Sequence, residues 1–329
     1  MGSTDGVLLS SVEDMRRSER PPASRCDVVL LTWNRRDLLE PCVERLVRYT
    51  RRADRLIIVD NGSADPEALA YLNRLASGGP GEIKIEVVRL PENRSIATAL
   101  NAGLALATAP WICLLNNDVL VTAGWLDEML DVAERGQDIG LVNPMSNEFN
   151  CKPQRSGETI DDLARRLQAR RGQWVEHWMG VGFCLVLSQR VLRRIGMMDE
   201  GFRGGYFEDA DYSLRVQRAG LRCVIAEAAY VYHHGSATMR HDPGRSRLFQ
   251  ENEARFLAKW SKEPPRRIAW VLTGSTTKPL GEPATKGRAC GVSGQPVNGG
   301  QAQQRHAYIA GEDDPLIRRP EAEAAQHGL

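Results

Sequence analysis

Short apolar segments alternate with longer amphipathic segments through the first half of the chain. The apolar segments have the length and the β-branched residues of buried strands, and we expect strands over residues 26–32, 55–60, 83–90, 111–116 and 139–144. Between them apolar residues recur at helical spacing, which predicts helices over residues 37–50, 66–76, 95–109 and 123–135. Strands that alternate with helices predict an α/β fold with a mostly parallel central sheet and helices on both faces.

The alternation becomes irregular in the second half. Residues 145–178 are interpreted as an insertion with one helix, 159–171, for which Thr159 is the expected N-cap. After it we expect a strand at 180–188, a helix at 207–220 and two strands at 221–227 and 229–235. The sequence thus predicts one domain over residues 25–262. The polar, aperiodic ends predict a disordered leader, 1–24, and a largely disordered tail, 263–329.

Composition narrows the class of protein. The chain has 43 Lys plus Arg and 42 Asp plus Glu, a balance that argues against binding nucleic acid by charge alone. Its seven cysteines are scattered without a C-x-x-C pair, which argues against a disulfide framework or a zinc site. Neither a long apolar segment nor a signal-peptide pattern is present. We expect a cytoplasmic protein, with peripheral association at the inner face of the membrane left open.

Polar residues follow three of the expected parallel strands where each one ends. The segments are TWNR, VDNGS and NND, and the carboxyl ends of parallel strands face one crevice, where ligands bind. A dinucleotide or a P-loop site would need a glycine-rich turn after the first strand, but that turn reads TWNRRD. A bound diphosphate would therefore need another source of positive charge, such as a divalent cation at Asp118.

The motifs TWNR, VDNGSAD, LLNNDV, FEDADYSLR and HHGSAT occur in an order and at a spacing that resemble the family 2 glycosyltransferases of GT-A fold. The resemblance covers about residues 26–239 and is strongest to the bacterial rhamnosyltransferase-like branch. It implies transfer of a hexose or deoxyhexose from a nucleotide-sugar donor to a glycan or lipid-linked acceptor, in polysaccharide biosynthesis of the cell envelope. It also implies a metal-dependent, inverting reaction with Mn²⁺ or Mg²⁺ as cofactor.

The resemblance implies donor and metal residues by position. Asn116, Asn117 and Asp118 match the family's D-x-D motif, with Asn116 in place of the first carboxylate, and Asp60 matches the acidic residue that contacts the nucleotide. The metal ligands would be Asp118, Asn116 and His233. The donor-binding residues would be Thr32, Asn34, Arg35, Asp60, Asn93, Asn117 and Asp118. Arg94 and Ser95 stand where the family often has glycine after Asn93.

The resemblance also implies the acceptor side. Asp209, in FEDAD, matches the family's proposed catalytic base. Inverting transfer needs one base for the acceptor hydroxyl and one cation for the leaving diphosphate. Glu208, Gly182 and Trp178 are the expected acceptor-binding residues. Gly182 lets the backbone approach a sugar, and Trp178 offers a stacking surface.

Structural interpretations stay open for the same residues. Asp60 is compatible with a simple turn, and the acids of FEDAD are compatible with helix capping. Trp174 and Trp178 are equally compatible with core packing. The arginines at 165, 166, 170 and 171 fit a solvated helix face or an anionic-lipid site. Two other functions also remain: a catalytically silent sugar-nucleotide or glycan-binding module, and a sugar nucleotidyltransferase. The latter class needs a Gly- and Lys/Arg-rich turn that TWNRRD does not supply.

Overall fold

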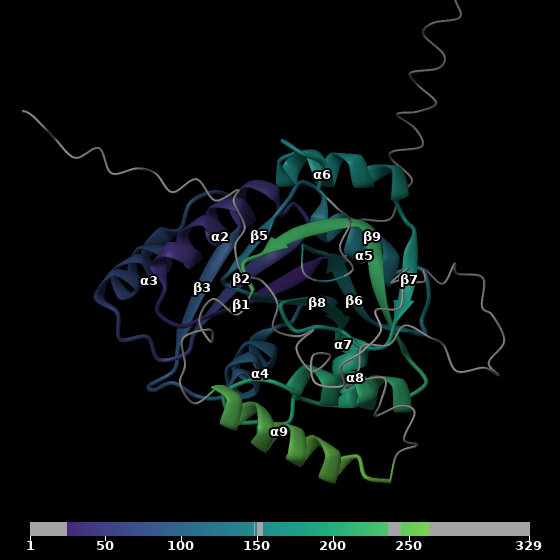
Figure 1. Cartoon of the computed structure of the whole chain (residues 1–329). Helices are drawn as coiled ribbons and strands as arrows, with labels where there is room; N and C mark the ends of the chain where they lie inside the picture. The colour runs from purple at the N-terminus through teal and green to yellow at the C-terminus, as the bar shows by residue number, and fades with distance from the viewer. Residues whose placement is uncertain (1–24, 148, 150–153, 236–244, 263–329) are drawn as a thin grey trace, which may run out of the picture. The chain divides into compact units, whose positions relative to one another are not determined.

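The computed structural model describes residues 25–147, 149, 154–235 and 245–262. The expected leader and tail lie outside these residues. The described chain is built on a nine-stranded sheet of order β3-β2-β1-β4-β8-β6-β9-β5, with β7 paired to β9 (Figure 1). The strands are β1 Cys26–Thr32, β2 Ala53–Asp60, β3 Lys84–Arg89, β4 Trp111–Asn116, β5 Val119–Val121, β6 Ile139–Met145, β7 Trp174–His177, β8 Cys184–Ser188 and β9 Arg222–His233.

The strands β3, β2, β1 and β4 are parallel and end together. Thr32 is in register with Asp60, and Leu31 is in register with Asn116. This alignment places the polar strand ends on one edge of the sheet, as the sequence predicts. Beyond β4 the directions mix, because β8 runs antiparallel to β4 and β6, and β9 runs parallel to β6 but antiparallel to β5 and β7.

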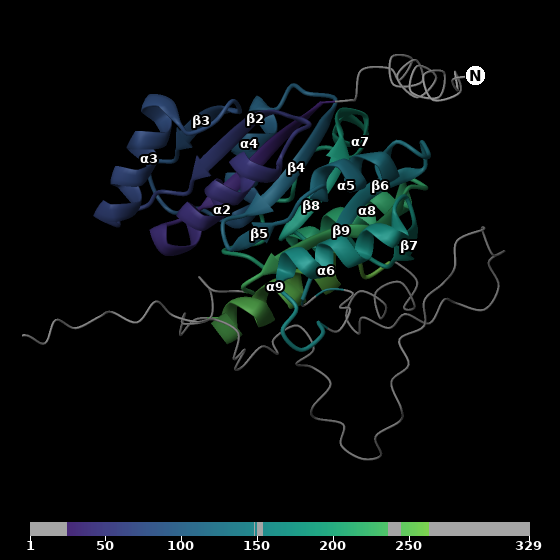
Figure 2. The same cartoon turned by 90° about the horizontal axis from the view of Figure 1, so that it is seen from above.

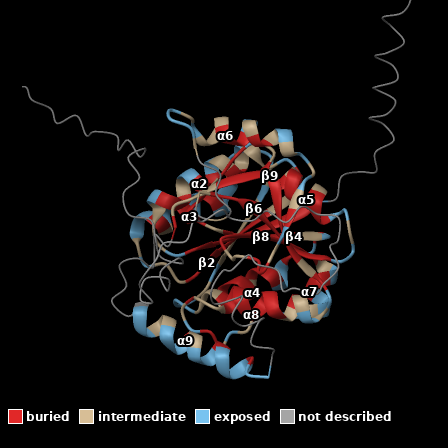
Figure 3. Ribbon diagram, turned by 45° about the vertical axis from the view of Figure 1, so that its right-hand side comes forward, coloured by how far each residue is buried: buried red, intermediate tan, exposed pale blue. Residues whose placement is uncertain are grey.

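Helices cover both faces of the sheet. They are α2 Arg36–Tyr49, α3 Pro66–Gly78, α4 Ile96–Leu106, α5 Trp125–Ala133, α6 Ile160–Leu167, α7 Gln189–Ile195, α8 Glu208–Arg218 and α9 Arg245–Lys259, with a 3₁₀ turn at Gln168–Arg170. Alternate residues of β1 enter two separate cores. Val28 and Leu30 pack with α2, α3 and α5, whereas Val29 and Leu31 pack with α4, α7 and α8. Burial on both faces explains why these strands are continuously apolar (Figure 3).

Two smaller apolar clusters attach the later elements. Leu163 and Leu167 of α6 pack with Ile225 and Tyr230 of β9 (Figure 2). Thr159 caps α6 with a reciprocal capping box to Asp162, which confirms the expected N-cap. On the other face, α9 packs against α8, where Phe256 of α9 and the following Trp260 meet Ala210 and Leu214 of α8 (Figure 1). Within the described residues no helix is long and apolar enough to cross a membrane.

Several elements differ from expectation. The two strands expected at 221–227 and 229–235 form one strand, β9, whose pairing with β6 is interrupted after Ala226. The buried acid that breaks the apolar pattern there, Glu227, forms an ion pair with Arg170. The strand β7 lies inside the segment interpreted as irregular. The short elements β5 and α7, and the C-terminal helix α9, were not expected.

Gly103 of α4 provides a test of how closely this helix approaches the sheet. A Cβ atom at Gly103 would lie 2.3 Å from Cγ1 of Val29 in β1. In an open helix, Gly→Ala stabilises by about 1 kcal/mol. Here we predict the opposite sign: Gly103→Ala should lower the free energy of unfolding by about 1–3 kcal/mol, because Val29 must move. Denaturant unfolding measures it.

The matched control is Ala105→Gly on the exposed side of α4. It should lose about 1 kcal/mol through helix propensity alone. A Gly103→Ala variant more stable than the parent would contradict the close packing of α4 on β1.

Candidate active site

Asp118 and His233 are brought together by the pairing of β5 with β9. Asp118 lies in the tight turn between β4 and β5, and Val119 is in register with His233. As a result, Oδ1 of Asp118 lies 3.3 Å from Nε2 of His233. The backbone carbonyl of Asp118 also accepts a hydrogen bond of 3.0 Å from the N–H of His234.

The imidazole of His233 is held in place from two directions. Its ring stacks on Phe183, with centroids 4.8 Å apart and planes 17° apart. Its backbone exchanges two hydrogen bonds with the Asn147 side chain, at 2.8 and 2.9 Å. The ring nitrogen is therefore fixed in its approach to the Asp118 carboxylate.

The pair has the spacing of two neighbouring metal ligands. Ligands about 2.1 Å from an octahedral ion lie about 3 Å apart, and the Asp118–His233 separation is 3.3 Å. A carboxylate oxygen with an imidazole nitrogen suits Mn²⁺, and the carboxylate suits Mg²⁺. Within the described residues no third His, Cys, Asp or Glu completes a metal-binding group. Asn116 ends β4 two residues earlier, and its role as a ligand stays a prediction.

The end of β1 lies beside this pair. The amide of Asn117 donates to Oγ1 of Thr32 at 3.0 Å, which ties the ends of β4 and β1 together. Asn34 and Arg35 follow with left-handed backbones, at φ 53° and 50°. The pKa of Arg35 is raised, chiefly by its hydrogen bond to Asp37 and to a smaller extent by the charge of Asp118. Arg35 thus adds positive charge near the Asp118 carboxylate.

The turn after β2 uses the side chains of Asn34 and Asp60. Oδ1 of Asn34 accepts from the N–H groups of Ala64 and Asp65, at 2.8 and 2.9 Å. Asp60 is fully buried; one carboxylate oxygen accepts from the N–H of Ser63 at 2.9 Å, and the other pairs with Arg89 at 3.1 Å. In the structure Asp60 thus stabilises the turn after β2, as the turn interpretation predicts. Its contact with a nucleotide stays a prediction.

Asn61 was not singled out from the sequence, yet it fixes the loop at residues 92–95, which carries Asn93 and is the proposed donor-side loop. Its amide exchanges two hydrogen bonds of 2.9 Å with the backbone of Arg94. Next to it, a Cβ at Gly62 would lie 2.3 Å from the backbone of Glu92. These contacts hold the loop that carries Asn93 against the end of β2. The Asn-Gly pair signalled a turn, but nothing in it signalled this long-range partner.

Glu208 and Asp209 begin α8 after two residues with left-handed backbones, Tyr206 and Phe207, at φ 77° and 70°. Oδ2 of Asp209 accepts from the N–H of Gly182 at 3.0 Å, and Oδ1 accepts from the N–H of Ala210 at 2.8 Å. Within the described residues, Oε2 of Glu208 is buried without a hydrogen-bond partner. Non-glycine residues in this backbone region are costly and cluster at functional sites.

Burial changes the proton affinity of both acids. It raises the pKa of Glu208 to about 8, with a further contribution from the charge of Asp209. Burial also raises the pKa of Asp209, whereas the hydrogen bonds from the Gly182 and Ala210 N–H groups act to lower it. Glu208 is therefore protonated at neutral pH, and Asp209 is a more basic carboxylate than one exposed to water.

One short segment joins the acidic pair to the Asp118–His233 pair. Gly182 donates to Asp209, and the next residue, Phe183, stacks on His233. The segment is fixed by Asn143 of β6, whose buried amide bonds to both backbone groups of Val181 and to the carbonyl of Cys184, at 2.6–3.0 Å. Asn143 was missed because it interrupts an apolar strand without belonging to a motif.

The loop before α8 is anchored by Asn252 of α9. Its Nδ2 donates to the carbonyls of Arg203 and Gly205, at 2.9 and 2.7 Å, and its Oδ1 accepts from the N–H of Arg203 at 3.3 Å. Asn252 is 3% exposed. It could not be identified from the sequence because α9 itself was not expected.

Two other groups adopt structural roles. Trp178 is buried in the apolar cluster with Phe202, Phe256 and Trp260, as core packing requires; the acceptor contact predicted for it gains no support from this placement. The arginines around α6 each pair with an acid: Arg165 with Asp162, Arg166 with Glu158, Arg170 with Glu227 and Arg171 with Glu128. Each arginine thus has an acidic partner, although the side chains of Arg165 and Arg171 remain 74% and 66% exposed.

The sequence profile of Glycosyl transferase family 2 matches residues 27–196. The chain belongs to this family and is a glycosyltransferase, as its motifs predict.

Among its relatives is the N-acetylglucosaminyl-diphospho-decaprenol L-rhamnosyltransferase of Mycobacterium tuberculosis, 24% identical over 75% of this chain and 89% of the relative. The O-antigen biosynthesis protein RfbC of Myxococcus xanthus is 26% identical over 66% of this chain and 18% of its own length. The chain also spans 27% of an uncharacterized Sinorhizobium fredii protein that it matches. These relatives include the rhamnosyltransferase-like branch that the motifs resemble.

Two solved structures share the fold. One is GalNAc-T7 with UDP, GalNAc and Mn²⁺, with a TM-score of 0.57 and 13% identity over 77% of this chain and 51% of that one. The other is the mannosyltransferase PcManGT from Pyrobaculum calidifontis with GDP-Man and Mn²⁺, with a TM-score of 0.54 and 17% identity over 80% and 76%. The predicted GT-A fold is confirmed.

The raised pKa of Glu208 predicts a specific dependence of stability on pH. Between the ordinary value of 4.5 and the native value of about 8, the native state binds more protons than the unfolded state. Stability attributable to Glu208 therefore falls as pH rises through this window. Glu208→Gln removes the titration. In EDTA, its free energy of unfolding relative to the parent should rise from about pH 5 to about pH 8 and then level off.

Glu82→Gln is the control, because Glu82 is exposed. It should differ from the parent by a constant amount across the same range. A constant difference for Glu208→Gln as well would mean that Glu208 titrates in the native protein as it does in water.

Proposed function

We propose that this glycosyltransferase transfers a hexose or deoxyhexose from a nucleotide-sugar to a hydroxyl group of a glycan or lipid-linked acceptor, with inversion and with Mn²⁺ or Mg²⁺. The observation that carries the proposal is the Gly182–Phe183 segment. Of its two consecutive residues, Gly182 donates a hydrogen bond to the buried carboxylate of Asp209, and Phe183 stacks on His233. His233 lies 3.3 Å from Asp118, the spacing of two metal ligands.

The donor would bind at the ends of the parallel strands. Asp118 and His233, with Asn116 as a candidate third ligand, would hold the cation, which neutralises the leaving diphosphate. Thr32, Asn117 and Arg35 border the same position through their hydrogen bonds and charge. The two structural neighbours support this proposal because their titles name UDP or GDP-Man together with Mn²⁺.

The acceptor would bind on the α8 side. Asp209 takes the proton of the acceptor hydroxyl. The hydroxyl oxygen of the acceptor forms the bond to the anomeric carbon, and the bond from that carbon to the donor phosphate breaks. Glu208, protonated at neutral pH, adds no second negative charge beside it. Gly182 lies directly beside this carboxylate, since a Cβ at Gly182 would be in ordinary van der Waals contact with Asp209, at 3.6 Å.

The name of one relative supports the substrate class. The Mycobacterium tuberculosis enzyme is an L-rhamnosyltransferase of N-acetylglucosaminyl-diphospho-decaprenol. For this chain we infer a deoxyhexose donor and a lipid-linked acceptor of polysaccharide biosynthesis in the cell envelope. A lipid-linked acceptor would bring this protein to the inner face of the membrane as a peripheral enzyme.

Metal dependence is the first test. UDP and GDP should bind more tightly in Mn²⁺ than in EDTA, because a cation held by Asp118 would supply the positive charge that the diphosphate needs. Asp118→Ala should abolish that difference, and calorimetry measures it. Asp54→Ala, which removes a carboxylate exposed at the start of β2, should retain it. Equal affinity of the parent in EDTA and in Mn²⁺ would argue against a metal-bound donor.

The identity of the base is the second test. With a donor chosen by thermal-shift screening of nucleotide-sugars, Asp209→Asn should lower the transfer rate by at least about a hundredfold. Nucleotide binding should be unchanged, since the base contacts the acceptor. Glu208→Gln should have a milder effect because Glu208 is already protonated. The reverse order of effects would transfer the role of base to Glu208.

A further inference from the structure

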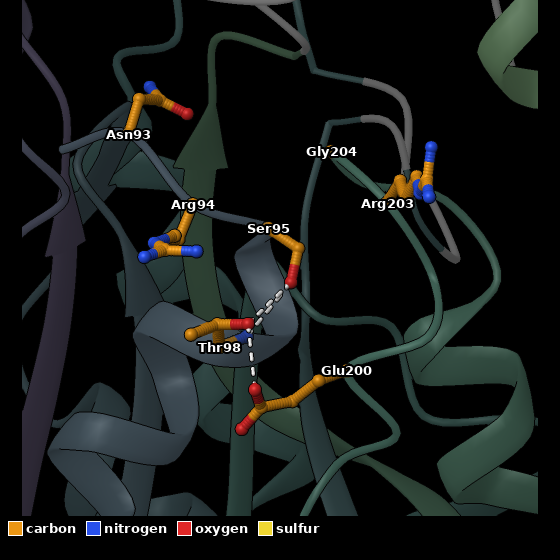
Figure 4. Close-up of a pocket in the computed structure, with 7 residues that line it drawn as sticks. All are labelled: Asn93, Arg94, Ser95, Thr98, Glu200, Arg203 and Gly204. Atoms are coloured by element: carbon orange, nitrogen blue, oxygen red, sulfur yellow. Dashed lines mark hydrogen bonds between the residues drawn. The ribbon is translucent and has the colours of Figure 1, made fainter.

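A pocket of about 370 Å³ opens between the start of α4 and the loop before α8 (Figure 4). Arg94 and Ser95 line it from the donor-side loop. Glu200 and Arg203 line it from the loop that leads to Asp209. Asn93, a predicted donor-binding residue, also lines the pocket, whereas Arg94, Ser95, Glu200 and Arg203 were assigned no role in the reaction.

The pocket carries positive charge that the protein does not fully neutralise. Arg94 pairs with Glu92, but the two side chains are 55% and 63% exposed, and such pairs are weak and readily exchanged. Arg203 is exposed, and the described part of the chain places no carboxylate within ion-pair distance of it. The pocket can therefore offer two guanidinium groups to a ligand.

The one carboxylate that lines the pocket, that of Glu200, keeps its negative charge but is held against α4 by two neutral donors. Glu200 accepts from Oγ1 of Thr98 at 3.0 Å and from Nδ2 of Asn101 at 2.8 Å. The first amides of α4 are also engaged, because Ile96 donates to the carbonyl of Gly204 and Thr98 donates to Ser95. The attraction for an anion thus comes from the arginines.

The backbone that carries Arg203 is fixed at both sides. Asn252 binds its N–H and its carbonyl, and the next carbonyl, that of Gly204, accepts from Ile96 at 2.6 Å. A guanidinium on a fixed backbone loses less freedom on binding a ligand, which favours phosphate recognition.

We propose that this pocket binds a phosphate or diphosphate group of the acceptor. The inference rests on the proposed function, in which the diphosphate of the donor lies at Asp118. The loop connects the two sites, because Gly204 lines the pocket and Asp209 follows five residues later. An acceptor held by its anionic group at Arg94 and Arg203 would present its sugar toward the base.

The first experiment uses inorganic pyrophosphate and the full chain in EDTA, so that no cation retains the probe at Asp118. Calorimetry should detect binding to the parent, and Arg203→Gln and Arg94→Gln should each weaken it by about tenfold or more, the loss expected for a charge-assisted contact. Arg193→Gln, an exposed arginine of α7 outside the pocket, should bind as the parent does. Absence of binding to the parent, or equal loss in the control, would overturn the proposal.

The second experiment distinguishes an acceptor phosphate from the donor. UDP and GDP are titrated in Mn²⁺ against the parent and Arg203→Gln. Unchanged nucleotide affinity supports an acceptor site, whereas a loss matching that for pyrophosphate assigns the pocket to the donor and overturns the proposal. If nucleotides fail to bind the parent at all, the proposed function fails, while the pyrophosphate titration still decides whether the pocket binds anions.

Discussion

The hydrogen bond from the Gly182 N–H to the Asp209 carboxylate links the two parts of the proposed active site. It is donated by a segment between β7 and β8 and accepted at the first turn of α8. Without it, a buried acid would have one fewer donor to stabilise its charged form. Because Phe183 follows Gly182 and stacks on His233, a shift of this segment would move Asp209, the proposed base, and the Asp118–His233 pair together.

The backbone is strained in two segments, and both contain or adjoin proposed catalytic or donor residues. Asn34–Arg35 and Tyr206–Phe207 adopt left-handed backbones without glycine, at a cost of order 1–3 kcal/mol per residue. Nearby side-chain amides offset that cost: Asn34 caps the turn after β2, and Asn252 binds the carbonyls ahead of Phe207. The two strained turns are thus held by contacts distant in sequence, which keeps them ordered before substrate arrives.

The sequence identifies those parts of the fold whose signal is local. The strands β1, β2 and β4 are apolar on both faces, so their existence and their polar ends can be predicted, and with them the position of Asp118. The long-range hydrogen-bond partners of single polar residues cannot be predicted in the same way. The contacts of Asn61 with Arg94, and of Asn143 with Val181, are made by single polar residues at large sequence separation. The helix α9 was missed because its buried face includes a polar residue, Asn252, which weakens the apolar periodicity.

The family profile ends at residue 196, before Asp209 and before α9. Asn252 of α9 anchors the loop that precedes α8. The profile therefore covers the strand ends that are proposed to hold the nucleotide, together with Gly182, whereas His233, the proposed base Asp209 and helix α9 lie downstream. Under the proposed function, substitutions in α9 and in the loop at 199–207 would alter the acceptor side while the strand ends around Asp118 stay the same. The same division sets a lower limit for engineering: a fragment cut at the end of the profile would retain Asp118 but lose His233, Asp209 and the anchor of its loop.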